Sequence, residues 1–304
     1  APYISRIYFC RYPLGETCYQ IYTMILFPRY HVFEIGDQSW CPEWVRAYIQ
    51  SYLTEVWNLH IPPFSKTSPA GVAADLIIEA LSDVSFYTFV DLCAGAGGPT
   101  GTIEKILNRK LEAEGQQAAR FILTDLYPRL EEWAVISKRQ DTVSFISEPL
   151  DATRCERIAP RDGKECRIFN LCFHHFDDPL ASTILRKAVE SADAIMIFEF
   201  AQRDITSMLN IPVMLLFPFW HTISKYRNSP LHLFFTYVIP LISFVLAFDG
   251  WVSTMRCRTS QELEELLRQQ DLDLSGWDIK SGKRMLFQPF VQMHYFMAVK
   301  KHTD

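Results

Sequence analysis

Residues 89–102 read FVDLCAGAGGPTGT, an apolar run that ends near Asp91 and passes into four glycines within seven residues. A glycine turn after a buried strand lets the backbone approach a ligand closely and starts a helix pointed at that ligand. Thr100 stands where the GxGxxG turn of nicotinamide-binding folds has its third glycine. A carboxylate before the turn would oppose a pyrophosphate, but it suits a ligand that carries an ammonium or a sulfonium.

Length and composition are those of an ordinary globular protein: 304 residues, 49% of them hydrophobic, with a net charge of −5. No long basic run occurs, so we expect no nucleic-acid partner. The eight cysteines include no CxxC pair, so we expect reduced, buried thiols and no metal site. Arg6 and Arg11 interrupt the apolar character of the first residues, so a signal peptide is not expected and a cytoplasmic protein is favoured.

Strand-like and helical patterns alternate from about residue 86. The strand-like runs are SFYTFVDL, ARFILTDL, TVSFISEPL, CRIFNLCF and DAIMIFEF, with helical patterns between them. This alternation predicts an α/β fold, a Rossmann-like doubly wound parallel sheet. Two later strand-like runs, near WDIKSG and FVQMHYFMAV, have no helix between them. We therefore expect a terminal hairpin, which completes a seven-stranded sheet with an antiparallel last strand.

The sequence divides into two predicted domains. Residues 1–85 form an N-terminal segment and helical cover, with one helix from an N-cap at Ser39 and a second over residues 70–81. Residues 86–304 form the main domain, which contains a helical insertion at about residues 201–258 after the fifth strand.

Three successive predicted strands end in a carboxylate: Asp91, Asp125 and Asp151. An acid at the tip of the second strand is placed to accept hydrogen bonds from ribose hydroxyls, and one at the third can accept from an adenine amino group. Any one of them alone is more often a solvated loop acid. Three at the carboxyl ends of successive parallel strands favour a shared nucleoside ligand.

These features together resemble the class I S-adenosylmethionine-dependent methyltransferases of small-molecule type. DLCAGAGG is similar to their first motif, TDLYPR to their ribose motif, DA to their adenine contact and NLCFHHFDD to their fourth-strand motif. The resemblance covers about residues 86–200 and the terminal hairpin, and it implies S-adenosylmethionine as the cofactor. The residues that it assigns to the cofactor are Asp91, Cys93 (glycine in many members), Gly95, Ala96, Gly97, Asp125, Leu126, Asp151, Ala152 and Asn170.

Two histidines are candidates for the chemistry of methyl transfer. The reaction needs a nucleophile held near the sulfonium methyl and, for a hydroxyl acceptor, a group that removes its proton. By resemblance the end of the fourth strand faces that methyl, and there the sequence has His174 and His175. Asp177 or Asp178 could orient a histidine base. In the alternative, one histidine packs in the loop and Asp178 caps the next helix, before a proline.

Glu199 is the third catalytic candidate. It ends the fifth strand between two phenylalanines, where an unpaired acid is costly. We expect it either to meet Arg203 or to line the substrate cavity.

Residues 205–224 and 228–248 carry no charged side chain. Each run has about the length that spans a bilayer, but prolines interrupt both, so we expect a helical lid over an apolar substrate. Peripheral membrane contact is the alternative, because the residues between the runs suit an interface. The expected lid-lining residues are Met208, Leu215, Phe217, Phe219, Phe234, Phe235 and Tyr237; the interfacial ones are Trp220, Lys225, Tyr226 and Arg227.

Three functions remain open from the sequence. The first is methyl transfer to a hydrophobic small molecule of secondary metabolism, such as a terpenoid, polyketide or lipid-like compound. The second is a non-methylating cyclisation or isomerisation of an apolar substrate on the same fold. The third is a non-catalytic membrane or partner-binding protein, against which the three strand-tip acids argue. Formation of S-adenosylhomocysteine in step with product separates the first two.

Overall fold

A seven-stranded mixed sheet forms the centre of the computed structural model, which describes residues 25–301. The strand order is β3-β2-β1-β4-β5-β7-β6, with β1 to β5 parallel and β7 antiparallel to both of its neighbours. The strands are β1 (Tyr87–Leu92), β2 (Arg120–Thr124), β3 (Val143–Phe145), β4 (Lys164–Asn170), β5 (Ala194–Glu199), β6 (Trp277–Phe287) and β7 (Val291–Lys300). The predicted Rossmann-like sheet with a reversed last strand is confirmed, and it is the fold of the class I methyltransferases.

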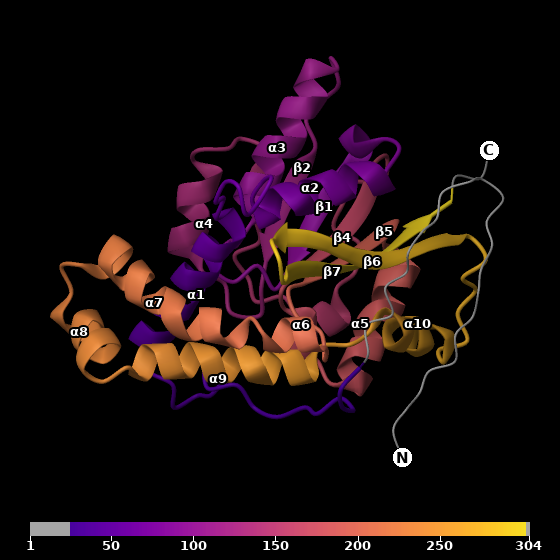
Figure 1. Cartoon of the computed structure of the whole chain (residues 1–304). Helices are drawn as coiled ribbons and strands as arrows, with labels where there is room; N and C mark the ends of the chain where they lie inside the picture. The colour runs from indigo at the N-terminus through magenta and orange to yellow at the C-terminus, as the bar shows by residue number, and fades with distance from the viewer. Residues whose placement is uncertain (1–24, 302–304) are drawn as a thin grey trace.

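Helices cover both faces of this sheet (Figure 1). Phe89 packs with α2 and α3 on one face, and its neighbour Val90 packs with α5 and α10 on the other, because successive strand residues point to opposite faces. All six residues of β1 and of β5 are buried, as expected for strands covered on both sides. The covering helices are α2 (Pro69–Ala80), α3 (Thr100–Ala113), α4 (Leu130–Ser137), α5 (Asp178–Ser191) and α10 (Ser260–Arg268).

The N-terminal cover contains α1 (Glu43–Asn58) and α2, as predicted. Ser68 caps α2 by accepting a hydrogen bond from the Gly71 amide at 3.2 Å. The predicted cap of the first helix at Ser39 is wrong, because residues 35–40 form turns and α1 begins only after Pro42. The residues of the N-terminal signal-peptide argument, Arg6 and Arg11, lie outside the described residues.

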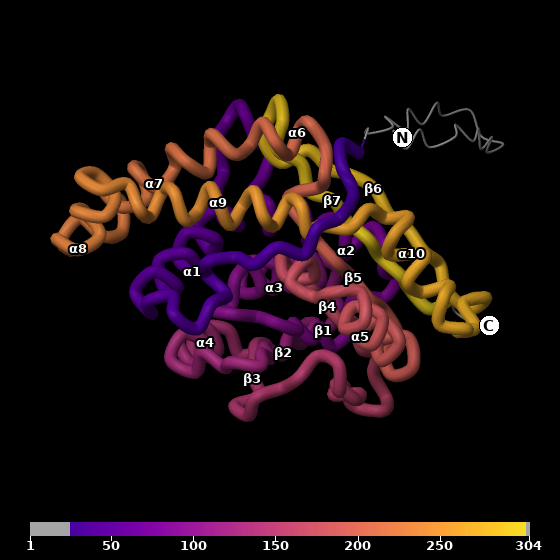
Figure 2. The backbone as a smooth tube through the Cα atoms, turned by 90° about the horizontal axis from the view of Figure 1, so that it is seen from below, coloured from indigo at the N-terminus to yellow at the C-terminus, as the bar shows by residue number. Residues whose placement is uncertain are grey.

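The insertion between β5 and α10 is helical, as predicted. It consists of α6 (Ile205–Met208), α7 (Ile211–Tyr226), α8 (Pro230–Leu233), a π-helical turn η4 (Phe234–Val238) and α9 (Leu241–Arg256). We refer to residues 211–256 as the helical arm. Its two long helices lie side by side and extend beyond the end of the sheet, with α8 at the tip (Figures 1 and 2).

Over residues 25–301, none of the helices has by itself the length and apolar character needed to cross a membrane. One bent pair, Pro230–Val238 with Leu241–Arg256, meets that criterion jointly, with a bend of 71°.

The remaining short elements are three 3-10 turns, η1 (Val84–Phe86), η2 (Ala152–Arg154) and η3 (Phe173–His175). The six cysteines in this part of the chain are unpaired, and five of them are buried, in agreement with the prediction.

Candidate active site

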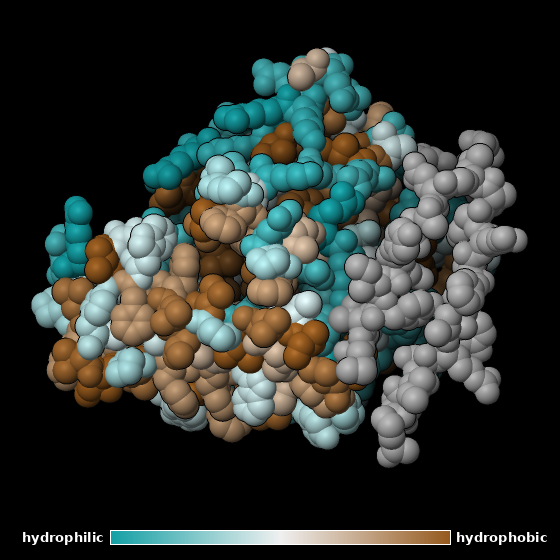
Figure 3. Space-filling view, in the orientation of Figure 1, coloured by the Kyte–Doolittle hydropathy of each residue, from teal (hydrophilic) through white to brown (hydrophobic). Residues whose placement is uncertain are grey.

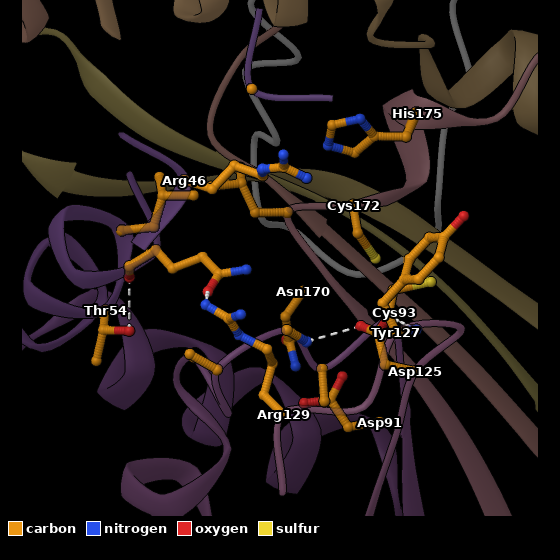
Figure 4. A pocket seen from close by; sticks show the side chains of 18 of the residues that line it. Arg46, Thr54, Asp91, Cys93, Asp125, Tyr127, Arg129, Asn170, Cys172 and His175 are labelled. Carbon is orange, nitrogen blue, oxygen red and sulfur yellow. Dashed lines mark hydrogen bonds between the residues drawn. The ribbon is translucent and has the colours of Figure 1, made fainter. Parts of the chain in front are cut away.

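A cavity of about 690 Å³ lies at the carboxyl ends of β1, β2 and β4 (Figure 4). The glycine turn after β1, residues 125–129 after β2 and the loop from β4 into η3 form its floor and one side. Helix α1 and the loop before it form the opposite side. Ligands of open parallel sheets bind outside these strand ends, so this cavity is the candidate cofactor and substrate site.

The turn after β1, which lines the cavity, has an unusual backbone conformation. Cys93, Gly95 and Gly97 have φ angles of 70°, 52° and 96°, in the left-handed region that favours glycine. Cys93 therefore adopts a conformation that glycine favours, and glycine is the residue that many members of the family which the sequence resembles have at this position. A Cβ atom on Gly97 would lie 2.3 Å from Cδ1 at the end of the Ile136 side chain, which would have to shift. Trp133 donates from Nε1 to the Gly95 carbonyl at 2.8 Å and fixes the turn.

Asp91 and Asn170 lie at the floor of the cavity with unused hydrogen-bonding atoms. Asp91 is 1% exposed, and its Oδ2 accepts a hydrogen bond from the Thr100 hydroxyl. Its Oδ1 and both amide atoms of Asn170 are buried with no partner in good hydrogen-bonding geometry among residues 25–301, although the Asn170 amide lies close enough to lower the pKa of Asp91 in part. Burial raises the pKa of Asp91 to about 7. Buried polar groups are normally satisfied, so this pair is suited to a ligand that donates hydrogen bonds and carries positive charge.

Asp125 lines the same cavity from the end of β2. Its Oδ2 accepts from the Gly95 amide at 2.8 Å and its Oδ1 accepts from the Tyr127 amide at 2.9 Å. These bonds hold the carboxylate in place and leave lone pairs on both oxygens, since a carboxylate can accept about four hydrogen bonds. The structure therefore brings two of the three strand-tip acids together, with Cys93, Gly95, Ala96, Leu126 and Asn170 around them.

Asp151 and Ala152 are not in this cavity. Strand β3 ends at Phe145, well before Asp151, so the predicted strand end near residue 150 is too late. Asp151 instead caps η2, where its Oδ1 accepts from the amide and the hydroxyl of Thr153 at 2.9 and 2.7 Å. It lines a separate hollow of about 470 Å³. Asp151 therefore lies outside the cavity that Asp91 and Asp125 share, although the Leu150 amide before it donates to the Asp125 carbonyl at 2.9 Å. Its contact with the adenine stays a prediction.

His175 lines the cavity, and His174 does not. His175 Nδ1 lies 3.0 Å from Asp37 Oδ2, and its Nε2 lies 4.0 Å from Glu34 Oε2. Burial favours the neutral ring, but the Glu34 and Asp37 carboxylates outweigh it and raise the pKa of His175 to about 9. At neutral pH the ring is therefore a cation, which can donate a hydrogen bond to a substrate but cannot accept its proton.

His174 is buried behind His175 and pairs with Glu199. Its Nδ1 lies 2.8 Å from Glu199 Oε2, and its backbone amide donates to Glu199 Oε1 at 3.1 Å. Both expectations for Glu199 are wrong: it does not line the cavity, and it does not meet Arg203. Arg203 binds Glu262 instead, at 2.6 Å.

The aspartates after the histidine pair belong to α5 and do not orient either histidine. Asp177 caps the helix, since its Oδ1 accepts from the Leu180 amide at 3.0 Å. Asp178 is the first helical residue and forms ion pairs with Arg29 and Arg258, at 2.6 and 2.8 Å. The predicted cap at Asp178 is therefore off by one residue.

The loop of residues 34–37, just before α1, supplies groups that sequence reasoning missed. Arg256 of α9 lies 3.0 Å from Glu34 and 3.1 Å from Asp37. Asp249 of α9 accepts from two amides of the loop, at 2.6 and 2.9 Å. Glu34, His174 and His175 are close enough to share a metal ion, but the Arg256 guanidinium already supplies positive charge to Glu34. We therefore interpret the cluster as an ion-pair network. The segment FEIGDQSW shows these acids, but no pattern indicates where they fold.

Helix α1 covers the cavity in place of the predicted lid. Arg46, Gln50 and Thr54 line the cavity from this helix, and Arg129, after β2, binds Gln50 and Glu43 at 2.8 Å each. Among the cavity-lining residues of the described chain, none comes from the 201–258 insertion. The insertion packs behind α1 instead, where the Tyr48 hydroxyl lies 2.8 Å from Thr222 Oγ1.

Comparison with known proteins finds similarity only among solved structures. No protein-family model matches the chain, and no curated protein is similar to it. A structure of the plantazolicin methyltransferase BpumL in complex with S-adenosylhomocysteine shares 14% identity over 86% of this chain and 98% of that one, with a TM-score of 0.42.

Two further similar structures are also methyltransferases by description. The mitomycin 7-O-methyltransferase MmcR shares 16% identity over 78% of this chain and 55% of its own, with a TM-score of 0.42. An O-methyltransferase family protein from Burkholderia thailandensis shares 13% identity over 78% and 57%, with a TM-score of 0.40. At this level of similarity the comparison bears on neither substrate nor catalytic residues, which must be argued from the cavity itself.

Proposed function

We propose that this protein binds S-adenosylmethionine in the cavity and transfers its methyl group to a hydrophobic small molecule. The observation that carries the proposal is the buried, unsatisfied pair Asp91 and Asn170, at the floor of a cavity at the carboxyl ends of parallel strands. An amino-acid ammonium group matches Asp91 Oδ1 and Asn170 Oδ1 in charge and in hydrogen bonding, and the amino-acid carboxylate can accept from Asn170 Nδ2. When bound, the cofactor supplies a methyl group on a positively charged sulfur.

Each part of the cofactor has a residue of matching chemistry. Asp91 and Asn170 would hold the ammonium, and the open backbone of the glycine turn allows close approach of the methionine part. Asp125 would accept hydrogen bonds from the ribose hydroxyls through its free lone pairs. Leu126 and Tyr127, exposed beside Asp125, offer apolar surface for the adenine ring.

His175 is the histidine that we assign to the acceptor. It is part of the cavity wall, whereas His174 is buried against Glu199. Because the His175 ring is held as a cation by two carboxylates, its role is to hold an acceptor oxygen that has already lost its proton, such as a phenolate, by donating a hydrogen bond to it. Methyl transfer to such an oxygen releases no proton, so no base is needed at this step. His174, which is paired with Glu199, lies against the His175 ring with a centroid distance of 4.3 Å. We therefore assign His174 and Glu199 as positioning residues.

The assignment of a hydrophobic acceptor rests on the rest of the wall. Leu53, Trp57, Ala94, Leu171 and Phe176 bring apolar surface to the cavity beside its charged groups. Small-molecule sites commonly combine such surface with a few polar groups that fix orientation.

Calorimetric titration with S-adenosylmethionine and S-adenosylhomocysteine tests the proposal. Wild-type protein should bind both ligands, and Asp125→Ala should weaken binding at least tenfold, because it removes the acceptors for two hydroxyls. Asp278→Ala is the matched control, since Asp278 is an exposed acid of β6 outside the cavity, and this variant should leave affinity unchanged. If folded wild-type protein binds neither ligand, the proposed cofactor is refuted.

Methyl transfer itself needs a separate measurement. With a panel of apolar acceptors, S-adenosylhomocysteine should accumulate in step with methylated product. Product formation without S-adenosylhomocysteine would instead identify a non-methylating enzyme.

A further inference from the structure

The helical arm presents a large apolar surface to its surroundings. Half of the exposed large hydrophobic side chains in the described chain fall between residues 205 and 251. Figure 3 shows brown, hydrophobic residues gathered over the arm, while the upper part of the molecule in this view is mostly teal. A patch of this kind on a folded protein usually marks a binding surface.

The exposed side chains follow the outer faces of the two long helices. On α7, Val213, Leu216 and Trp220 recur at helical spacing and are 53%, 64% and 53% exposed. On α9, Phe244 and Trp251 are seven residues apart and are 57% and 42% exposed. Residues at such spacings share one side of a helix, so each helix has a continuous outer apolar stripe.

The inner faces of the same helices are already occupied. Ile242 and Leu246 of α9 are buried against Tyr48 and Tyr52 of α1, together with Phe217 of α7. The arm therefore does not need its outer stripes in order to pack against the domain. The segment before α1 also contacts α9, since the rings of Phe33 and Phe248 lie 6.1 Å apart and the Tyr30 amide donates to the Met255 carbonyl. The exposed side chains of the two outer stripes lie beside these contacts and remain uncovered within residues 25–301.

The charged residues of the arm favour a lipid surface over other binding partners for this face. The chain as a whole has a net charge of −5, but residues 205–248 contain no acidic residue. Their only charged residues are basic and lie near the tip. Lys225 is in the last turn of α7, is 55% exposed and lies 4.0 Å from Glu55 Oε2 of α1, and Arg227 directly follows α7. Basic residues beside apolar and tryptophan side chains are the composition of segments that lie at a membrane interface.

The shape of the arm favours lying on a membrane over crossing it. The pair of segments that is apolar enough for a membrane is bent by 71°, at Pro240. We propose that the helical arm docks on the surface of a lipid bilayer, with the outer stripes of α7 and α9 at the acyl boundary and with Lys225 and Arg227 at the phosphate groups. Helix α1 connects this surface to the cavity, because it packs on the arm and lines the cavity.

Co-sedimentation with vesicles tests the docking surface. Full-length protein should bind vesicles of phosphatidylcholine mixed with phosphatidylglycerol more strongly than vesicles of phosphatidylcholine alone. Replacing Lys225 and Arg227 by glutamine should remove that difference, about fivefold for each residue. Leu216→Glu and Phe244→Glu should each lower binding to both vesicle types at least tenfold.

Phe86→Glu is the matched control, because Phe86 is 61% exposed and lies before β1, away from the arm. This variant should bind vesicles as wild type does, and an equal loss of binding in it would overturn the proposal. So would wild-type protein that binds neither vesicle type. A dimer in light scattering that Phe244→Glu abolishes, without vesicle binding, would assign the face to a second copy of the chain instead.

The same variants keep this inference distinct from the proposed function. All of the substituted arm residues lie outside the cavity, so affinity for S-adenosylmethionine in calorimetry should match that of wild type. Loss of vesicle binding with intact cofactor binding supports the docking surface.

Discussion

The pH dependence of cofactor binding should report the state of Asp91. Burial raises the pKa of this carboxyl to about 7 in the unliganded protein, and only the ionised form attracts an ammonium group. At pH 6, one unit below that pKa, about a tenth of the molecules carry the charge, so affinity should be about tenfold weaker than its high-pH limit. That factor corresponds to about 1.4 kcal/mol of binding free energy.

The sign follows from linkage between protonation and binding. A bound cation stabilises the Asp91 carboxylate and lowers its pKa, so affinity is full above about pH 7 and falls as the pH is lowered through that value. His175, with a pKa of about 9, stays charged over this range and contributes no slope. Between pH 5.5 and 7.5 the amino group of the cofactor also stays largely protonated, since its ordinary pKa is about 8.

Calorimetric titration with S-adenosylhomocysteine from pH 5.5 to 7.5 measures the effect. Wild-type protein should lose close to tenfold in affinity per pH unit at the acid end, and Asp91→Asn should bind weakly with no slope. Asp249 has a pKa raised by burial to about 6, so circular dichroism should accompany each titration to show that the loop before α1 remains folded. A flat wild-type profile, or a slope that survives in Asp91→Asn, would refute the reasoning.

Three further predictions concern stability. Asp91→Asn should stabilise the unliganded protein at pH 8 by up to about 4 kcal/mol in urea unfolding, because the buried charge is penalised only above its unfolded pKa; no gain would contradict the burial argument. Gly97→Ala should cost about 2–4 kcal/mol through strain and contact with Ile136. Gly115→Ala, also at positive φ but in open space, should cost only about 1 kcal/mol. Thermal melts of the two glycine variants measure this difference. Asp249→Ala should cost about 2 kcal/mol in urea unfolding, because two loop amides lose their acceptor.

Local pattern was sufficient to predict the sheet and half of the candidate site. Each strand is a short apolar run between turns, and the parallel arrangement follows from the helices between them. Asp91 and Asp125 could be assigned to one cavity because neighbouring parallel strands end at the same edge. The same logic did not place Asp151 in that cavity, because β3 is only three residues long and Asp151, six residues after its end, caps the η2 turn.

The other half of the site depends on contacts between distant segments. Helix α1 and residues 34–37 reach the cavity although they precede β1 by about thirty to fifty positions, and α9, more than 150 positions after β1 begins, binds that loop. Periodicity identifies α1 as a helix, since its apolar residues repeat at helical spacing, but it does not indicate which strand ends the helix covers. The sequence therefore predicts that the long apolar insertion covers the cavity. In the structure the polar face of α1 covers it instead.

The partners of buried charges show the same limit most clearly. The sequence predicts that Glu199 either meets Arg203, four residues away, or lines the substrate cavity, because an unpaired buried acid is costly. In the structure Glu199 accepts from the backbone of His174 and pairs with its ring, 25 residues earlier. The register of β4 beside β5 places Asn170 opposite Phe198, so the η3 turn must lie at the end of β5. Sheet register, which no single segment encodes, therefore decides which charges meet at this edge.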